Sequence, residues 1–306
     1  MATVMGGGSR IRTNTPADNA YYALMQSNTN IQESQLRLST GKRINSAADD
    51  VAGYITSRSL KARNVSLKSA LNAVGDAQNV SSITMDALDN IDNLLTKIKD
   101  AASSASAGAL ATDEKVALAK GAYRLVEQIQ TVVDSSVFGG KDLLKGSYSG
   151  SWTIGFDSAN TPLRLSFDMS TASTNVDYVN LNSKTTDAFA GISGLNLTDL
   201  NSVTSSSLGV FAESNISTTL TSISSALNSL AVFSSQVGGI HNRLTSQSDL
   251  LQSQITNFKA AISRIEDTDI AQEQLNLVKN QFLQQSSLIS LSQANQNPSS
   301  FLQLLR

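Results

Sequence analysis

Cysteine is absent from this chain of 306 residues, and histidine occurs once, at His241. The first absence excludes disulfide frameworks, thiolate nucleophiles and zinc sites with cysteine ligands, and the second excludes any site that needs two imidazoles. Aromatic residues make up only 5% of the chain beside 40% hydrophobic residues, which favours a thin core over that of a compact enzyme. We therefore expect no enzymatic activity, no bound metal and no cofactor.

Net charge and long apolar runs are also scarce. The 23 basic and 25 acidic side chains leave a formal net charge of −2, so the chain lacks the basic footprint of a nucleic-acid-binding protein. No run approaches the roughly 20 apolar residues that span a bilayer, and the first residues lack the apolar stretch of a cleaved signal peptide. We expect no nucleic-acid partner, no membrane insertion and no conventional secretion signal.

A heptad repeat in the last third is the most informative pattern present. Apolar residues at this spacing, with others four positions later, predict one long helix packed against other helices. About 50 helical residues extend roughly 75 Å, which predicts an elongated rod. Gly238 and Gly239 interrupt the run and mark a bend or a close helix contact, while His241 is expected to be a packed, hydrogen-bonded residue of the seam. The seam consists of Ile216, Ile223, Leu230, Val237, Leu244, Leu251, Phe258 and Ile265.

Two further helices are predicted before it. One heptad phase joins Leu60, Leu67, Val74, Leu88 and Leu95, and a third helical run extends from Val116 to Val133. Thr112 is the expected N-cap of that third helix, with two acidic residues in its first turn, where the helix dipole favours negative charge. The three helices are expected to form a bundle.

The period changes to two in the middle of the chain. Trp152, Ile154 and Phe156 alternate with small or polar residues, and a similar alternation from Leu163 to Met169 follows a turn sequence, which predicts a β-hairpin. The polar segment 170–208 is expected to be loop-rich surface. The predicted fold class is mainly α: an elongated antiparallel helical bundle or coiled-coil rod with a small β-hairpin region.

Weaker apolar stripes occupy both ends of the chain, among many Asn, Gln and Ser residues. Such stripes bury too little apolar surface to offset the entropy of ordering, so the terminal helices are expected to need each other and copies of the same chain. The residues that we expect to be covered during assembly are Leu24, Ile31, Leu38, Leu275, Phe282, Ile289 and Leu291.

Three long motifs resemble the signatures of one family. Residues 36–53, LRLSTGKRINSAADDVAG, are similar to the N-terminal signature of bacterial flagellins. Residues 263–273, SRIEDTDIAQE, and residues 283–306, LQQSSLISLSQANQNPSSFLQLLR, resemble the C-terminal signature. The motifs lie at opposite ends in the family's order, and the similarity extends over about residues 11–147 and 208–306.

The resemblance implies a division into four parts. Residues 11–46 and 268–306 would form an inner domain of terminal helices, and residues 47–147 and 208–267 an outer helical rod domain. Residues 148–207 would form the β-hairpin and a polar, exposed variable segment. Residues 1–10 precede the usual start of the family pattern, so they are either a short leader that is removed or an extra arm, and Met5 is an alternative start.

The function implied by the resemblance is that of a structural subunit that self-polymerises into the flagellar filament for swimming. The subunit would leave the cell unfolded through the flagellar type III system, and its location would be extracellular. Its expected partners are other copies of the chain, the filament cap, the hook–filament junction proteins and an export chaperone. The alternative is a hook–filament junction protein, which forms only a short ring, and an additional adhesin role stays open.

Other site predictions follow from the same resemblance. Arg43, Asn45, Asp49 and Asp50 match the spoke between the inner and outer domains and are expected to contact other subunits or cap helices. Adjacent aspartates on a helix point about 100° apart, which argues against a catalytic pair. Residues 97–101 depart from the block that an animal innate immune receptor recognises, and this argues against receptor binding. Exposed Ser205, Ser206 and Ser207 are candidate sites for O-linked sugars.

Overall fold

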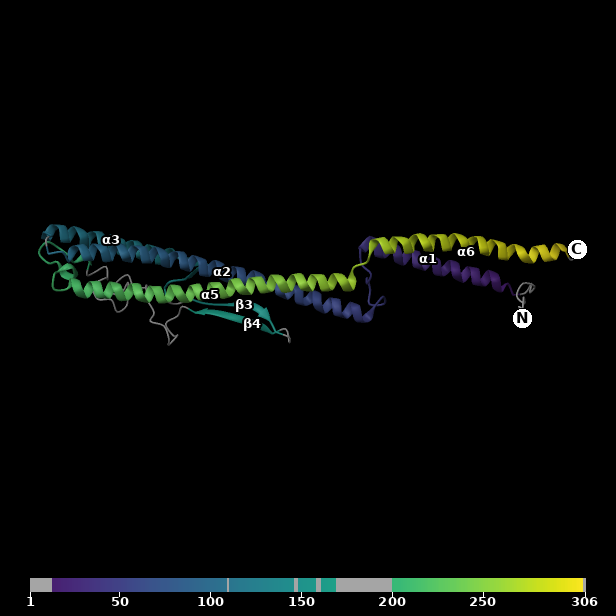
Figure 1. Cartoon of the computed structure of the whole chain (residues 1–306), viewed down its shortest axis with the longest axis horizontal. Helices are drawn as coiled ribbons and strands as arrows, with labels where there is room; N and C mark the ends of the chain where they lie inside the picture. The colour runs from purple at the N-terminus through teal and green to yellow at the C-terminus, as the bar shows by residue number, and fades with distance from the viewer. Residues whose placement is uncertain (1–12, 109, 146–147, 158–160, 169–199, 305–306) are drawn as a thin grey trace. The chain divides into compact units, whose positions relative to one another are not determined.

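The computed structural model describes residues 13–108, 110–145, 148–157, 161–168 and 200–304, and within these ranges it confirms the mainly helical fold class with a small β-hairpin (Figure 1). The long helices of this described part are α1 (Thr15–Thr40), α2 (Val51–Ala105), α3 (Thr112–Ser135), α5 (Ile216–Glu266) and α6 (Ile270–Leu304). The strands are β1 (Val137–Phe138), β2 (Lys141–Asp142), β3 (Ser149–Phe156) and β4 (Pro162–Asp168), and η1 (Gly209–Phe211) is a short 3₁₀ helix. None of the helices described is long and apolar enough to cross a membrane.

Contacts divide the chain into two compact units. The terminal unit comprises residues 1–64 and 256–306, and the central unit comprises residues 65–255. These divisions fall inside α2 and α5. The domain boundaries predicted from the sequence, after residues 46 and 267, fall instead in the two connections between helices.

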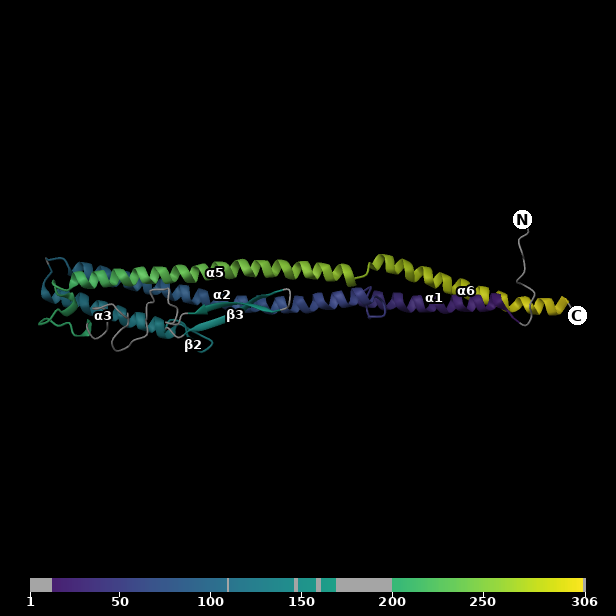
Figure 2. The same cartoon turned by 90° about the horizontal axis from the view of Figure 1, so that it is seen from below.

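The central unit has one apolar core between α2, α3 and α5, which lie side by side in both views (Figures 1 and 2). The predicted helix of the last third is confirmed as α5, a single helix of 51 residues. Its heptad residues are buried because the 3.6-residue period keeps them on one face toward α2 and α3. Those that are at most 5% exposed are Ile216, Ile223, Leu230, Val237, Leu244 and Leu251.

The start of α3 differs from the prediction by one residue. The N-cap is Ala111 and not Thr112, which is the first residue of the helix. The side chain of Glu114 accepts a hydrogen bond of 3.1 Å from the backbone N–H of Ala111, as the glutamate of a capping box does. The predicted acidic first turn, Asp113 and Glu114, is confirmed.

The predicted β-hairpin is confirmed as the antiparallel pair β3–β4. A shift of register between Thr153 and Gly155 leaves Ile154 as a bulge residue. The carbonyl of Ile154 accepts a hydrogen bond of 2.7 Å from Nε2 of Gln247 in α5, and the Ile154 side chain is buried. The bulge thus attaches the hairpin to the helical bundle.

A second, smaller hairpin was not predicted. Strands β1 and β2 are joined by Gly139 and Gly140, both with positive φ, which glycine adopts without steric cost and which matches the twist of a tight hairpin. Lys145 follows this hairpin and forms ion pairs of 3.1 Å with Asp134 of α3 and 3.2 Å with Asp142 of β2. Strands of two residues carry too little alternation to be detected in a sequence.

The predicted loop-rich surface at 170–208 needs a correction where the structure describes it. Residues 170–199 lie outside the described residues. Leu200 and Val203 are 1% and 2% exposed and belong to the core of the central unit, so the end of this segment is packed and not merely surface. Two isolated apolar residues in a polar stretch give no periodic signal, so the sequence could not distinguish them from surface residues.

Gly238 and Gly239 do not mark a close helix contact, contrary to one of the alternatives drawn from the sequence. A Cβ atom built on either residue would meet nothing within 4 Å, and α5 is continuous through both positions. No neighbouring atom excludes a larger side chain at either glycine. Each glycine therefore only weakens the helix, through its greater conformational freedom in the unfolded chain.

Replacing Gly239 by alanine is expected to raise the free energy of unfolding of the central unit by about 1 kcal/mol, because alanine loses less conformational entropy in a helix. Urea unfolding followed by fluorescence of Trp152, the only tryptophan, measures this change. The matched control is Gly140→Ala, where φ is 78° and alanine is expected to destabilise by about 1 kcal/mol. Equal effects of the two substitutions would contradict the interpretation.

In the terminal unit, α1 and α6 lie side by side and antiparallel (Figures 1 and 2). Asn14 donates from Nδ2 to the carbonyl of Ala294 at 2.9 Å, and Gln284 donates from Nε2 to Oδ1 of Asn28 at 2.6 Å. The residues of α1 that are buried are small and seven apart, namely Ala20, Ser27 and Ser34. The pair therefore buries little apolar area of its own, in agreement with the weak stripes of the sequence.

Candidate functional site

The predicted assembly residues lie on two different sides of the α1–α6 pair. Leu24, Ile31 and Leu38 of α1 are half-buried and share the face of Ala20, which packs on α6; Leu291 of α6 is also half-buried. Leu275, Phe282 and Ile289 are 66%, 68% and 70% exposed. The two groups therefore have different environments in a single chain.

The reason lies in the helical period of α6. At 100° per residue, the buried and half-buried positions gather on the side that faces α1, and most of them are polar or small: Glu273, Asn276, Leu277, Asn280, Gln284, Ser287, Leu291 and Ala294. The same period places Leu275, Val278, Phe282 and Ile289 on the opposite side, where all four are exposed. We call these four residues the outer stripe.

Large apolar side chains are also exposed on α1. Tyr21, Tyr22, Met25 and Leu36 are each at least half exposed, and the rings of the two tyrosines contact each other edge to face with centroids 6.2 Å apart. Contiguous exposed apolar surface on a soluble protein marks a site of interaction. The terminal unit thus offers two distinct apolar surfaces, one on each helix.

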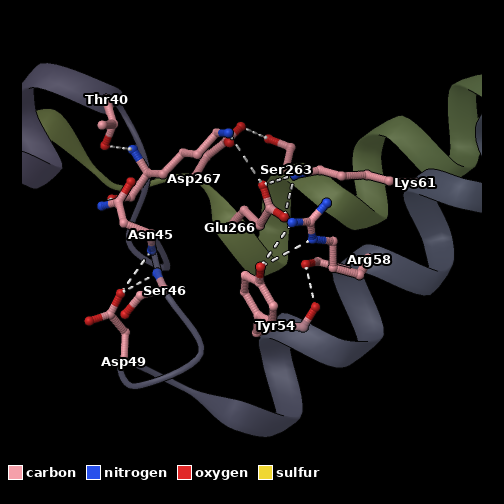
Figure 3. A network of polar contacts seen from close by, with 12 residues as sticks. Thr40, Asn45, Ser46, Asp49, Tyr54, Arg58, Lys61, Ser263, Glu266 and Asp267 are labelled. Carbon is pink, nitrogen blue, oxygen red and sulfur yellow. Dashed lines mark hydrogen bonds and ion pairs between the residues drawn. The ribbon is translucent and has the colours of Figure 1, made fainter.

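A polar junction joins the α1–α2 connection to the α5–α6 connection (Figure 3). Helix α1 ends at Thr40 and is capped by Gly41, whose φ of 70° is the left-handed conformation typical of a helix C-terminus. The backbone N–H of Arg43 then donates to the carbonyl of Glu266 at 2.5 Å, and the N–H of Thr268 donates to the carbonyl of Gly41 at 3.0 Å. These bonds pair the two connections directly.

The side chain of Glu266 lies at the centre of this junction and is 5% exposed as a residue. Both carboxylate oxygens lie 2.5 Å from Nζ of Lys61, and Nζ of Lys42 lies 3.9 Å away. Burial raises the pKa of Glu266. Hydrogen bonds from Lys61 and Ser57 and the charges of Lys61 and Lys42 together lower it by more, so the net pKa lies below its ordinary value. The carboxylate is therefore ionised at neutral pH.

Asp49 and Asp50, the adjacent aspartates of the predicted spoke, serve separate turns. Oδ2 of Asp49 accepts hydrogen bonds from the backbone N–H groups of Asn45, at 2.9 Å, and Ser46, at 2.8 Å. The bond from Ser46, followed by that from Asn45, lowers the pKa of Asp49. Oδ1 of Asp50 accepts from the N–H of Gly53 at 2.9 Å, as an N-cap of α2 does. The two carboxylates therefore bind separate backbone groups and do not converge on one point.

Arg43 and Asn45 complete the predicted spoke set. The guanidinium of Arg43 donates to the carbonyl of Ile265 at 2.9 Å and lies 4.0 Å from Asp50. Nδ2 of Asn45 donates to the carbonyl of Lys42 at 3.0 Å. All four spoke residues therefore make contacts within the terminal unit of one chain. Their expected contacts with other subunits stay a prediction.

Sequence reasoning missed Ile44, Lys61 and Glu266. Ile44 is 3% exposed and fills the junction, and a Cβ at Gly53 would lie 2.7 Å from its Cδ1, so the glycine of the motif leaves room for this side chain. Lys61 and Glu266 are 205 residues apart, and nothing in the local pattern of either predicts their ion pair. Only the isoleucine had a signal, as the one large apolar residue of the polar connection 41–50.

Among the remaining predicted residues, Ile265 takes part in this junction through its backbone carbonyl. Phe258 and Ile265, the last two members of the α5 seam, lie in the terminal unit and are half-buried, with the guanidinium of Arg63 5.9 Å from the centre of the Phe258 ring. Ser205, Ser206 and Ser207 are exposed in a tight turn of the central unit. Across the described ranges, no group of three or more His, Cys, Asp or Glu residues is arranged to hold a metal ion.

Comparison with known proteins matches both ends of the chain to the same family. The model of the bacterial flagellin N-terminal helical region matches residues 11–149, and that of the C-terminal helical region matches residues 220–305. The Bacillus subtilis (strain 168) protein YvzB is 32% identical over 182 residues, which are 60% of this chain and 98% of YvzB. The chain belongs to the bacterial flagellin family.

Other flagellins match over greater lengths. Flagellin from Bacillus subtilis (strain 168) is 29% identical over 310 residues, which cover 97% of this chain and all of that protein. The crystal structure of Bacillus cereus flagellin is 18% identical, with a TM-score of 0.43, and the match covers 61% of this chain and 93% of that one. Flagellins are structural and not enzymatic, and they are the subunits of the extracellular flagellar filament.

Proposed function

We propose that this flagellin polymerises with copies of itself into the filament that propels swimming cells, and that neighbouring copies cover the apolar surfaces of its terminal unit. The observation that carries the proposal is the outer stripe, whose leucine, phenylalanine and isoleucine are each about two-thirds exposed at heptad spacing. Burying such side chains contributes about 1.5 to 3 kcal/mol each. A surface of this kind favours association.

The two apolar surfaces differ, and this favours an open polymer. The outer stripe of α6 is aliphatic with one phenylalanine, whereas α1 offers two adjacent tyrosines with Met25 and Leu36. A contact between unlike surfaces is heterologous, and repetition of a heterologous contact generates a helical filament when the rotation does not close. In this arrangement residues 11–46 and 268–306 form the inner domain, and residues 47–147 and 208–267 form the outer helical domain.

The thin α1–α6 core supports the expected route to the filament. The apolar contacts within the α1–α6 pair are too few to offset the entropy lost when the helices become ordered. The terminal helices are therefore readily unfolded before assembly. We infer that the chain is exported unfolded through the flagellar type III system with the help of a chaperone. It then folds at the growing end, beneath a cap and beyond the junction proteins. The polar junction around Glu266 forms the spoke of the folded subunit.

The alternative, a hook–filament junction protein, is not favoured, because the relatives that match nearly the whole chain are flagellins. Seeded polymerisation of the purified chain tests the choice. We expect long tubes in negative-stain micrographs after addition of sheared filament seeds. Short rings would favour the alternative, and a chain that stays monomeric with seeds at high concentration would contradict both.

A further inference from the structure

A polar layer interrupts the apolar seam of the central unit. On α2, the heptad positions Leu67, Val74, Leu88 and Leu95 are at most 2% exposed, and the intervening position in the same phase is Ser81, which is 1% exposed. A seam that buries a serine in a row of leucine and valine gives up apolar contact at that level.

The partner of Ser81 is the single histidine of the chain. Nδ1 of His241 on α5 lies 2.8 Å from Oγ of Ser81, which also lies 2.9 Å from the carbonyl oxygen of Gln78. The serine hydroxyl can donate to that carbonyl while its oxygen accepts from the imidazole N–H. One turn away, Nε2 of Gln78 donates to Oγ1 of Thr245 at 3.3 Å. Both contacts between the helices fit one antiparallel register.

The apolar part of the seam does not select this register by itself. Both helices repeat their apolar residues every seven positions, so a slip of seven residues places apolar side chains against apolar side chains again. The polar layer changes in such a slip, because His241 would then face the level of Val74 or Leu88. The half-buried imidazole would then lie against an apolar side chain without its partner on α2, and losing a hydrogen-bond partner in a partly buried place costs free energy.

We propose that the Ser81–His241 pair fixes the register of α2 against α5 when the chain folds. The pair makes the native alignment the one in which the half-buried imidazole is hydrogen-bonded to the buried Ser81, and it disfavours alignments shifted by one heptad. Its role is discrimination between pairings, so an apolar replacement is expected to lose fidelity without losing stability.

The absence of cysteine makes a direct test available. A chain with Gln78→Cys and Thr245→Cys reports the native register through a short thiol–thiol cross-linker. Chains that combine Gln78→Cys with Gly238→Cys or with Gln252→Cys report the two slipped registers, since seven residues move a helix by roughly 10 Å. Each reporter chain is unfolded in denaturant, refolded by dilution and cross-linked.

His241→Leu in these reporter chains is expected to raise slipped cross-linking relative to native cross-linking by about tenfold, in keeping with the loss of one partly buried hydrogen bond between the helices. The thermal midpoint is expected to stay the same or rise, because leucine fills the seam. His241→Gln, whose amide can bond to Ser81, is expected to restore the native ratio. Unchanged cross-linking ratios in His241→Leu would overturn the proposal.

The matched control is Thr84→Val. Thr84 is also fully buried on α2, but its hydroxyl donates within its own helix, to the carbonyl of Val80 at 2.8 Å. We expect this change to leave the cross-linking ratio as it is in the parent chain. Equal slippage in Thr84→Val and His241→Leu would show that the loss of any polar group near the seam has the same effect as the loss of the bond between the helices. That result would also overturn the proposal. If His241→Leu does not refold, Ser81→Val provides the same comparison.

Discussion

A chain that carries Leu275→Asn, Phe282→Asn and Ile289→Asn is expected to remain folded and to fail to extend filament seeds. All three side chains are exposed in the single chain, so asparagine costs the α1–α6 pair little. If neighbouring copies cover the outer stripe as proposed, the same three side chains contribute on the order of 5 kcal/mol per subunit to assembly, which is a factor of more than about a thousand in affinity. Sedimentation after seeding measures the loss, and circular dichroism reports the retained helix.

A conservative triple variant separates apolar character from position. Leu275→Val, Phe282→Leu and Ile289→Val keep the stripe apolar, and this chain is expected to polymerise.

Deletion of residues 270–306 is expected to abolish polymerisation, as the asparagine variant does, while the helices of the central unit persist. Filaments of normal length from the asparagine variant or from the truncated chain would show that the outer stripe does not form the subunit contact.

Glu266→Gln is expected to lower the free energy of opening of the polar junction by about 1 to 2 kcal/mol, because it removes the charge that Lys61 and Lys42 contact. The figure is modest for a buried carboxylate because the side chain of Lys61 is 39% exposed and is partly hydrated after the change. The backbone N–H groups of Arg43 and Thr268 bond across the junction, so their hydrogen-exchange protection is the readout. We expect roughly a tenfold fall in protection.

The same ion pair makes the junction sensitive to acid. The folded-state pKa of Glu266 lies below its ordinary value of 4.5, so the stabilisation is fully present above that pH and is lost as the pH falls through the lowered folded value. The parent chain is therefore expected to approach Glu266→Gln in junction protection as the pH falls through the lowered folded-state pKa of Glu266. Asp49, whose pKa is also lowered, supplies acid sensitivity that remains in the variant.

Glu33→Gln is the control for this experiment. Glu33 forms an ion pair with Arg37 four residues away on the exposed side of α1, and such pairs contribute only a few tenths of a kcal/mol. Junction protection in Glu33→Gln is expected to match that of the parent chain at every pH. If Glu266→Gln keeps full protection at neutral pH, the backbone bonds hold the junction without the carboxylate and the interpretation is wrong.

The helices and the larger hairpin were predictable because their signals are periodic and local. Heptad spacing across 50 residues can be satisfied only by a helix, and alternation around Trp152 only by a strand, so α5 and β3 followed from the pattern. The β1–β2 hairpin and the buried Leu200 and Val203 were not predictable, since two residues contain no period. The cap of α3 was misplaced by one residue because threonine is the better cap by residue type, whereas the helix start is satisfied by Glu114, which accepts from the backbone N–H of Ala111.

The amino-acid sequence alone determined the helical class, the absence of cysteine chemistry and the two terminal motifs of the flagellin family, because each depends on residue type and spacing along one chain. It also identified Phe282 and Ile289 as members of an apolar stripe. Only the tertiary structure decided that this stripe points away from α1, that Lys61 meets Glu266, and that His241 meets Ser81. Those facts depend on which faces of distant helices are brought together, and side-chain spacing within one helix carries no information about its partner's position.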